Sequence, residues 1–322
     1  MAADGDDRQW IDHPSGYLAL AAGNEQWRLP GVRGFVVYRV HGRHLVTFGG
    51  VHASPDDRAA LLASLVEHAS SRRLRVLAVQ VRADQVPLFE AQGFTVNRFG
   101  RSYAVTLAKF TFRGTPKMKL RNKIKRAQPL LTVGEVGVEV PRTAETFAAL
   151  HAVSNAWLAK KKKKEIEFMV GQLGGPDEAE RRVFVARDLN GDTVGFITYV
   201  PVFGRRRGYL HDLTRKRPDA PTGTMELINS VALERLRQEG VEYLHFGFTP
   251  FVVDGPEPAS ASRLMSRAVE FLARYGSLVY PAQTQVSYKL KWGPDVIETE
   301  FLAGRPLSVR AVIDLLVLTR SL

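Results

Sequence analysis

The chain has 322 residues, of which 45% are hydrophobic and 24% charged, so it can bury one large core or two smaller ones, and we expect two domains. It contains no cysteine, which excludes disulfides, thiolate zinc sites and a cysteine nucleophile and favours a reducing, cytoplasmic compartment. Its 45 Lys and Arg residues against 33 Asp and Glu give a net charge of +12, which indicates RNA, DNA or an anionic membrane as partner unless the charge only maintains solubility.

The first half of the chain begins with a predicted hairpin. Its two β-rich runs, Arg33 to Val40 and His44 to Gly49, are joined across His41-Gly42. The segments that follow predict a helix, a strand, a short helix and an extended return. These are a helix after Ser54, a strand at Leu74 to Val81, a helix at Pro87 to Gln92 and a return at Phe94 to Leu107.

The same order recurs after residue 180, where Asn190-Gly191 gives the strongest hairpin signal in the chain. The predicted elements are strands at Val183 to Ala186, Val194 to Val200 and Gly208 to Leu213, a helix at Thr222 to Gln238, a strand at Val241 to Phe248, a helix at Ser260 to Tyr275 and a strand at Gln283 to Trp292. An amphipathic helix at Ser308 to Leu318 follows, which either docks on the core or reaches a lipid interface.

A repeated order of mixed elements predicts an α/β (α+β) fold with mostly antiparallel mixed sheets flanked by helices. Leu88 to Phe94 resembles the closing helix and turn of GNAT acetyltransferases, so we expect two tandem GNAT-like domains. We place a flexible tail at residues 1–14, the first domain at 15–130 and the second domain, with the active site, at 131–322.

A strongly basic helix is predicted at Thr115 to Gln128, between the halves. Leu120, Ile124 and Ala127 form one narrow apolar stripe, which predicts that one side docks while the remainder is cationic. Six cations in ten residues repel one another without a polyanion, so we expect this helix to bind tRNA or another nucleic acid. The expected contacts are Lys117, Lys119, Arg121, Lys123, Lys125 and Arg126.

A second basic run, Lys160 to Lys164, ends an amphipathic helix that contains Trp157. Lys160, Lys161 and Lys162 are further expected tRNA contacts. Cations are also favoured at a helix C-terminus by the helix dipole, so a solvated helix end is an equally good interpretation of this run.

The most specific signal lies between Tyr209 and Ile228. This segment resembles the catalytic domain of bacterial phosphatidylglycerol lysyltransferases and alanyltransferases, and three further blocks agree with that family in order: Ser154 to Ala159, Phe246 to Pro250 and Tyr288 to Pro294. The residues that match the motif are Asp212, Arg215, Pro218, Asp219, Ala220, Pro221, Gly223, Met225 and Glu226.

The chain also departs from that family. Asn155 replaces an Asp and Trp292 replaces a Phe. No apolar run reaches the roughly 20 residues of a membrane helix, so we find no counterpart of the membrane-spanning domain of the lipid enzymes and expect no integral membrane segment. We therefore expect a soluble acceptor, in natural-product biosynthesis for example, in preference to a phosphatidylglycerol-like lipid; peripheral membrane contact stays open.

The resemblance implies that an aminoacyl-tRNA is the donor. Because its ester is already activated, transfer to an amine or hydroxyl needs positioning and oxyanion stabilisation rather than a covalent intermediate. Asp212 would orient the donor's α-ammonium or accept a proton, and Arg215 would hold a phosphate or the terminal ribose; an Asp–Arg salt bridge is the alternative for this pair. Further expected substrate contacts are Asp219, Gly223, Glu226, Thr249 and Tyr288.

Two lysines complete the predicted site. Strand alternation across Val286 to Trp292 directs Lys289 and Lys291 to the same face, where they would grip the tRNA acceptor end or stabilise developing negative charge; a solvated sheet face is the alternative. His211 would point to the opposite face from Asp212, so a packed or surface histidine is favoured over a general base.

No metal site and no cofactor are expected. Coenzyme A is the second choice of donor: Pro221-Thr-Gly-Thr could offer N–H groups to an anion, but the GNAT pyrophosphate fingerprint is not clear in either half. Two alternatives to the aminoacyltransferase remain, an acyl-coenzyme A-dependent N-acyltransferase and a non-catalytic RNA-binding protein.

Overall fold

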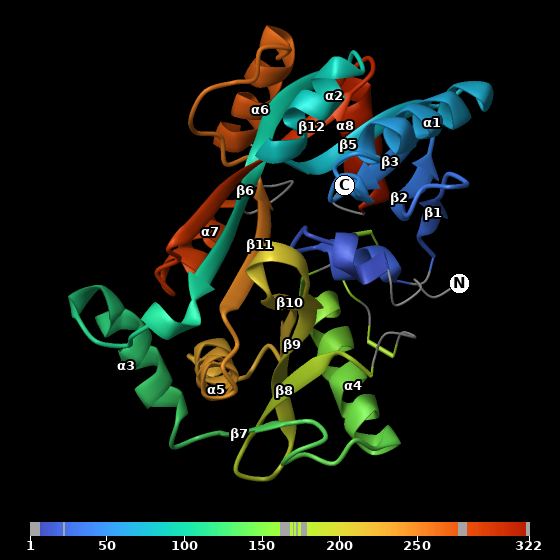
Figure 1. The fold of residues 1–322 in the computed structure, drawn as a ribbon. Coiled ribbons are helices and arrows are strands. Elements are labelled where there is room, and N and C mark those ends of the chain that lie inside the picture. The colour runs from blue at the N-terminus through green and yellow to red at the C-terminus, as the bar shows by residue number, and fades with distance from the viewer. Residues whose placement is uncertain are drawn as a thin grey trace.

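The computed structural model describes residues 7–21, 23–161, 168–169, 171, 173–174, 179–275 and 282–319. Within these residues, twelve strands form one mixed sheet in the order β1-β2-β3-β5-β12-β6-β11-β10-β9-β8-β7, with β4 paired to β2. Helices flank this sheet along its whole length (Figure 1). The predicted α/β class, a mostly antiparallel GNAT-like sheet flanked by helices, is confirmed.

The elements of the first half follow the predicted order closely. The predicted hairpin is formed by β2 and β3, which pair antiparallel up to His41 and His44. The bounds are 3-10 helices at Asp7–Trp10 and Gly16–Leu20, β1 Glu25–Trp27, β2 Gly34–His41, β3 His44–Phe48, β4 His52–Ala53, α1 Arg58–Ser71, β5 Arg75–Arg82, α2 Val86–Ala91 and β6 Thr95–Thr106.

The remaining elements begin with the basic helix. The bounds are α3 Met118–Ala127, β7 Thr132–Glu135, α4 Ala144–Lys161, β8 Arg182–Arg187, β9 Thr193–Val202, β10 Gly208–Lys216, α5 Thr224–Gln238, β11 Tyr243–Pro250, α6 Arg263–Tyr275, α7 Ala282–Leu290, β12 Val296–Gly304 and α8 Val309–Leu318. The buried stripe predicted for α3 is present, because Leu120, Ile124 and Ala127 are all buried.

Each half repeats one pattern of strands and helices. Antiparallel strands (β1 to β3, and β7 to β10) lead into a helix (α1 or α5), after which the chain returns in a strand parallel to the last one. These parallel pairs are β3 with β5 and β10 with β11. A helical crossover is the connection that parallel neighbours require, so the repeated order in the sequence reflects a repeated topology.

The two halves share one sheet because two strands cross between them. The long strand β6 pairs with β11 of the second half, and β12 inserts between β5 and β6. The division into two domains at residue 130 stays a prediction. In the segment predicted as a tail at 1–14, residues 7–14 contain a 3-10 helix and bury Ile11 and His13, while residues 1–6 lie outside the described residues.

The strand predicted at Gln283 to Trp292 is wrong: most of this segment is the helix α7. Its alternating apolar residues do not share a face, since Trp292 is fully buried while Leu290 is half exposed. The inward residues Lys289 and Trp292 are three apart, which is a helical spacing. The strand that follows, β12, was not predicted, and it occupies the place between β5 and β6.

The helices cover the two faces of the sheet separately. In the second half, Leu150 of α4 packs on one face with Phe196, whereas Leu227 and Ile228 of α5 pack on the other face. In the first half, α1 and α2 share a core with one face, and α6 and α8 share a core with the other. Alternate strand residues supply these cores, as a pleated sheet requires.

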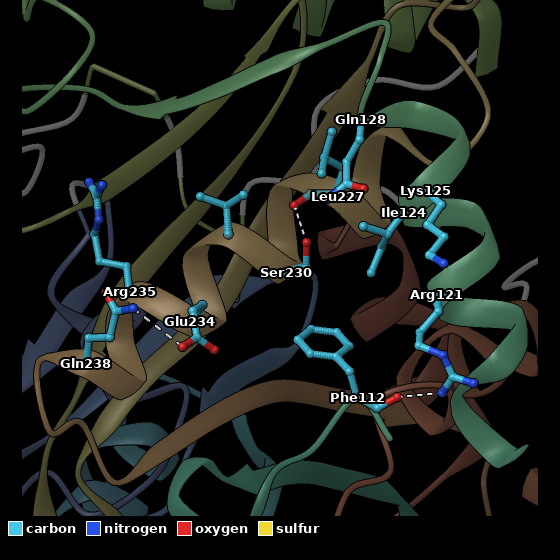
Figure 2. A pocket seen from close by; sticks show the side chains of 11 residues that line it. Phe112, Arg121, Ile124, Lys125, Gln128, Leu227, Ser230, Glu234, Arg235 and Gln238 are labelled. Atoms are coloured by element: carbon cyan, nitrogen blue, oxygen red, sulfur yellow. Dashed lines mark hydrogen bonds between the residues drawn. The ribbon is translucent and has the colours of Figure 1, made fainter. Parts of the chain in front are cut away.

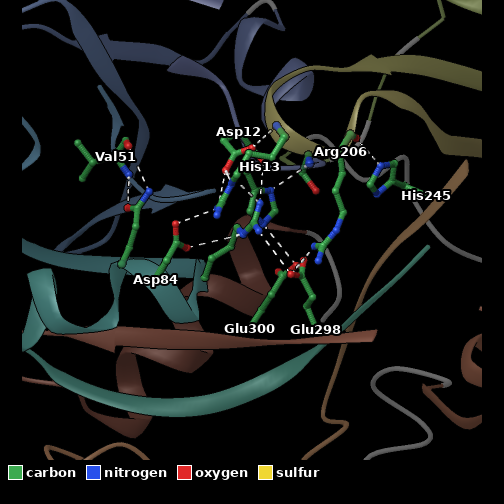
Figure 3. A network of polar contacts seen from close by, with 12 residues as sticks. Asp12, His13, Val51, Asp84, Arg206, His245, Glu298 and Glu300 are labelled. Atoms are coloured by element: carbon green, nitrogen blue, oxygen red, sulfur yellow. Dashed lines mark hydrogen bonds and ion pairs between the residues drawn. The ribbon is translucent and has the colours of Figure 1, made fainter. Parts of the chain in front are cut away.

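A polar network joins the N-terminal segment to both halves (Figure 3). Asp12 accepts hydrogen bonds from the backbone and side chain of Arg205, both at 2.7 Å, and its carbonyl accepts one from Arg82 at 2.8 Å. Arg82 also pairs with Glu298 on β12 at 3.4 Å, and Arg206 pairs with the same carboxylate. The turn between β9 and β10 is thereby tied to the end of β5.

Candidate active site

The candidate site lies where two parallel strands separate. The pairing of β10 with β11 covers only Gly208 to Leu210 against Tyr243 to His245. Just beyond this point both strands carry an irregularity in register, between His211 and Thr214 on β10 and between His245 and Gly247 on β11. Bulges end pairing and re-aim side chains. A cavity of about 650 Å³ lies at this point.

The cavity is lined by elements from both halves of the chain. The second half provides the separated parts of β10 and β11, the start of α5, the end of α4 and one side of α7, and α3 provides one lysine. The first half provides the Gly16–Leu20 helix and the end of β5. The lining side chains that bear on the predictions are Gln80, Lys123, Trp157, Lys161, His211, Asp212, Arg215, Lys216, Gly223, Glu226, Tyr288 and Lys289.

Asp212 is held in a buried ion pair, with only 3% of its side chain exposed. Its partner is Arg181, whose side chain is fully buried, and not Arg215, whose pairing with Asp212 was the alternative considered from the sequence. The same carboxylate accepts hydrogen bonds from the backbone N–H of Gly171 at 3.0 Å and from the hydroxyl of Thr198 at 3.4 Å. Asp212 therefore lines the cavity with its charge already compensated.

Arg215 lies against the ring of Trp157, with its guanidinium carbon 4.1 Å from the ring centroid. This cation–π contact joins two sequence blocks that lie about sixty positions apart, one on α4 and the other on β10. Arg215 is 8% exposed, so its planar cation is oriented at the cavity rather than free in solvent. Such an arrangement suits a planar or anionic group.

Lys289 projects inward from α7 and lies over the turn that ends β11. Its ammonium donates hydrogen bonds to the carbonyls of Gly247 and Phe248 and to the hydroxyl of Thr249, at 2.8, 2.9 and 2.7 Å. Burial lowers the pKa of Lys289 to about 7. With three acceptors for its three hydrogens, Lys289 fixes the turn that forms one wall of the cavity.

Glu226, in the first turn of α5, gathers two lysines from distant segments. Its carboxylate pairs with Lys123 of α3 at 3.0 Å and with Lys291 at 3.1 Å. Burial alone would raise its pKa, but these hydrogen bonds outweigh burial and lower the pKa of Glu226. Gly223, just before α5, has a φ of 97°, and a Cβ there would lie 2.2 Å from the carbonyl oxygen of Lys123. Only glycine permits this close approach of α3.

Three predicted site residues do not line the cavity. Asp219 is exposed and pairs with Arg217, Thr249 lies behind Lys289, and Lys291 is turned toward Glu226. The expectation that Lys289 and Lys291 point the same way was wrong, because they lie on a helix and just past its end, not on a strand. The remaining predicted catalytic and substrate-binding residues lie around one cavity.

The cations of α3 divide into two groups. Lys117, Arg121 and Lys123 bond within the protein: the first two donate to backbone carbonyls, and the third pairs with Glu226. Lys119, Lys125 and Arg126 are exposed, as are Lys160 and Lys161 at the end of α4. Lys162 lies outside the described residues. The outward cationic surface is therefore smaller than the sequence suggests.

A second hollow lies between α3 and α5, with a volume of about 490 Å³ (Figure 2). Phe112, Ile124 and Leu227 contribute apolar walls, while Arg121 and Lys125 lie on the α3 side. The hydrogen bond from Arg121 to the carbonyl of Phe112, at 2.6 Å, holds this wall in place. None of the residues predicted to be catalytic lines this hollow.

Two important residues escaped the sequence reasoning. Arg181 carried no signal, because its partner Asp212 is 31 positions away. Gln80 had a weak signal, as a single polar residue in the apolar strand Leu74 to Val81. It is 4% exposed, its backbone has a φ of 55°, and its side-chain oxygen has no hydrogen-bond partner although it lines the cavity.

Buried histidines give the fold a pH dependence. Burial lowers the pKa of His52 and His211 to about 3 and that of His245 to about 4. His211 packs against Tyr199 and Phe246, as the packed histidine favoured from the sequence. Because the unfolded chain binds protons near pH 6.5 and the folded chain does not, stability is full above pH 6.5 and falls as the pH drops toward 3.

As the pH is lowered from 7 to 5, we expect the urea concentration at the midpoint of unfolding to decrease. Each histidine contributes at most about 1.4 kcal/mol of lost unfolding free energy per pH unit. His211→Phe should flatten this dependence, whereas His151→Phe, at an exposed position on α4, should not. The assignment of a neutral, partly buried His211 would be contradicted if the urea midpoint of His211→Phe changed with pH as steeply as that of the parent protein.

Two kinds of feature are absent from the residues that the structure describes. Among them, no group of three or more His, Cys, Asp or Glu side chains is arranged to hold a metal ion. No helix within the described part of the chain is long and apolar enough to cross a membrane.

Comparison with known proteins gives a consistent family. The family model described as "Phosphatidylglycerol lysyltransferase, C-terminal" matches residues 7–304. A phosphatidylglycerol lysyltransferase of Staphylococcus epidermidis is 23% identical over 261 residues, which are 81% of this chain and 30% of that protein. The chain thus spans about a third of the length of the curated relatives that it matches.

Solved structures show the same fold over almost the entire chain. The C-terminal domain of a putative lysylphosphatidylglycerol synthetase from Agrobacterium fabrum has a TM-score of 0.80 at 23% identity and covers 98% of this chain and 94% of its own. L-PGS from Bacillus licheniformis has a TM-score of 0.77 at 21% identity, covering 99% and 98%. At these identities, the similarity establishes the fold.

Proposed function

Because the chain belongs to the phosphatidylglycerol lysyltransferase C-terminal family, we propose that it transfers an aminoacyl group from aminoacyl-tRNA to a hydroxyl of a phosphatidylglycerol-like lipid. The observation that carries this proposal is the cavity at the separation of β10 and β11, which gathers most of the family-motif residues. The family membership moves our preference from a soluble acceptor, favoured by the sequence, to a lipid acceptor. A soluble acceptor becomes an outcome of the test.

The charge of the cavity suits an anionic donor. Its described lining includes five basic side chains against two carboxylates. Asp212 is compensated by Arg181 from outside this lining, whereas Glu226 is compensated by Lys123, one of the five, and by Lys291. A tRNA acceptor end brings phosphates to such a site, where a preorganised cation is worth more than in water. The cations are Lys123, Lys161, Arg215, Lys216 and Lys289.

The reaction needs little covalent chemistry from the protein. The acceptor hydroxyl oxygen attacks the aminoacyl carbonyl carbon, the ester bond to the tRNA ribose breaks, and the hydroxyl proton passes to the ribose oxygen. In this proposal Arg215 binds the acceptor end and stabilises the developing oxyanion, and the start of α5 adds backbone N–H groups. Asp212 holds the wall of the site through Arg181 instead of binding the α-ammonium.

The outward cations of α3 and α4 would guide the tRNA toward this cavity. Lys119, Lys125 and Arg126 are exposed on α3, and Lys123, on the next turn, reaches the cavity lining. Lys161, at the end of α4, also lines the cavity. Exposed cations beside the cavity steer a polyanion toward it by long-range attraction.

A transfer assay tests the proposal. The protein is incubated with bulk tRNA charged with one radiolabelled amino acid at a time, together with vesicles that contain phosphatidylglycerol. We expect label in the lipid extract for at least one amino acid, and loss of this transfer after ribonuclease treatment.

The controls separate the alternatives. Label on an added soluble amine or hydroxyl compound, with none in the lipid, would overturn the lipid acceptor and retain the transferase. Stable esters with every acceptor would contradict the proposal. Saturable coenzyme A binding with ribonuclease-insensitive acyl transfer would instead identify an acyl-coenzyme A enzyme.

A further inference from the structure

Two helices share one core on the face of the sheet that also carries the Gly16–Leu20 helix. Met265 and Val269 of α6 and Val312 and Leu315 of α8 belong to the same buried cluster. Figure 1 shows both helices at the end of the molecule opposite β7. Because both helices cover the same face of the sheet through this shared cluster, their outward sides both turn away from that face.

The outward sides of α6 and α8 are unusually apolar. Six of the thirteen exposed large apolar side chains in the described chain lie on these two helices. On α8, Val309, Ile313 and Val317 follow one another at intervals of four, which places them in one stripe. The three on α6 are Leu264, Phe271 and Tyr275, each more than 60% exposed.

The charges around this apolar surface are mainly positive. Four arginines are exposed on the two helices: Arg263, Arg267, Arg274 and Arg310. Glu270 is the exposed carboxylate of α6. Asp314 of α8 contacts His44, with 2.6 Å between its Oδ2 and the Nδ1 of His44. Exposed aromatic and aliphatic side chains between arginines are typical of helices that lie in the interface of an anionic bilayer.

We propose that the outward surface of α6 and α8, called here the α6–α8 surface, docks on an anionic lipid bilayer. Its apolar side chains enter the headgroup region while the arginines contact lipid phosphates. A second copy of the chain fits less well, because a two-fold interface would bring the four arginines of each copy together and charged residues are depleted from interface cores. The proposal concerns binding alone and does not depend on the transferase reaction.

The test measures flotation of the intact chain with vesicles, without tRNA. The vesicles are phosphatidylcholine, or phosphatidylcholine with 30% phosphatidylglycerol, an amount chosen to make about one lipid in three anionic. We expect binding to the anionic vesicles that weakens with salt, and little binding to the neutral ones. Leu264→Ser combined with Phe271→Ser should reduce the partition coefficient at least tenfold.

Matched substitutions serve as the control. Val138→Ser with Leu189→Ser removes two equally exposed apolar side chains beside β7 and between β8 and β9, and should leave binding unchanged. Equal binding of both double variants would overturn the proposal. So would binding that survives the α6 changes but is lost on charge reversal of Lys119, Lys125 and Arg126. A dimer that dissociates in Leu264→Ser/Phe271→Ser would identify a second copy as the occupant and would also overturn it.

Discussion

Asp212→Ala is expected to lower the free energy of unfolding by about 3–5 kcal/mol, because it removes the carboxylate that pairs with the buried guanidinium of Arg181. The side chain of Arg181 is fully buried, and that of Asp212 is 3% exposed, so neither charge can be compensated by water. The variant also removes the acceptor for the N–H of Gly171 and the hydroxyl of Thr198. Urea denaturation at pH 7 measures the loss.

A double variant separates this loss from an effect on catalysis. In Arg181→Met/Asp212→Leu both charges are absent, so most of the stability lost in Asp212→Ala should return, since apolar side chains can replace a buried ion pair without large cost. As an exposed control, Asp219→Ala removes the partner of Arg217 and should cost no more than about 1 kcal/mol.

The opposite result would be informative as well. If Asp212→Ala kept the stability of the parent protein but lost transfer, the carboxylate would act on the substrate, as the sequence motif first suggested. If the double variant were stable and still transferred the aminoacyl group, the role of Asp212 would be only to hold the wall of the cavity.

Local patterns in the sequence predicted much of the fold. The apolar stripe of α3 and the hairpin of β2 and β3 depend on residues that are close in sequence, and both are present. The repeated order of strands and helices in the two halves could be predicted because each element also depends on residues that are close in sequence. The alternation at Val286 to Trp292 failed because seven residues with mixed spacing fit a strand or a helix equally well. The packing of Trp292 into the core of the second half favours the helix over the strand.

The sequence identified several residues of the candidate site but not the ion pairs that these residues form. Arg215, Glu226 and Lys289 were identified through a motif, and they lie around one cavity. Which charges pair with which could not be predicted, because Arg181 comes from outside the motif and Lys123 from another helix. Burial and the separation of β10 from β11 arise only once strands distant in sequence have paired.

Arg215→Ala is expected to lower kcat/KM for aminoacyl transfer by about 10²–10³-fold, the cost of losing a preorganised group that stabilises developing negative charge. The guanidinium is oriented by its contact with Trp157, 4.1 Å from the ring centroid. Arg215→Lys should recover little, since a lysine ammonium neither stacks in the same way nor presents a planar fork of donors. Trp157→Phe should retain most of the activity and Trp157→Ala less, in proportion to the lost orientation.

A neighbouring arginine provides the matched control for this prediction. Arg217 lies two positions further along the chain, outside the cavity lining, where it pairs with the exposed Asp219. Arg217→Ala should therefore transfer at the parent rate. If Arg215 acts on the transition state, its loss lowers kcat; if it only binds the tRNA acceptor end, its loss raises KM with kcat unchanged. Parent-like transfer by Arg215→Ala, with an unchanged thermal unfolding curve, would remove Arg215 from the reaction and leave Lys123, Lys161 and Lys216 as the cations that hold the donor.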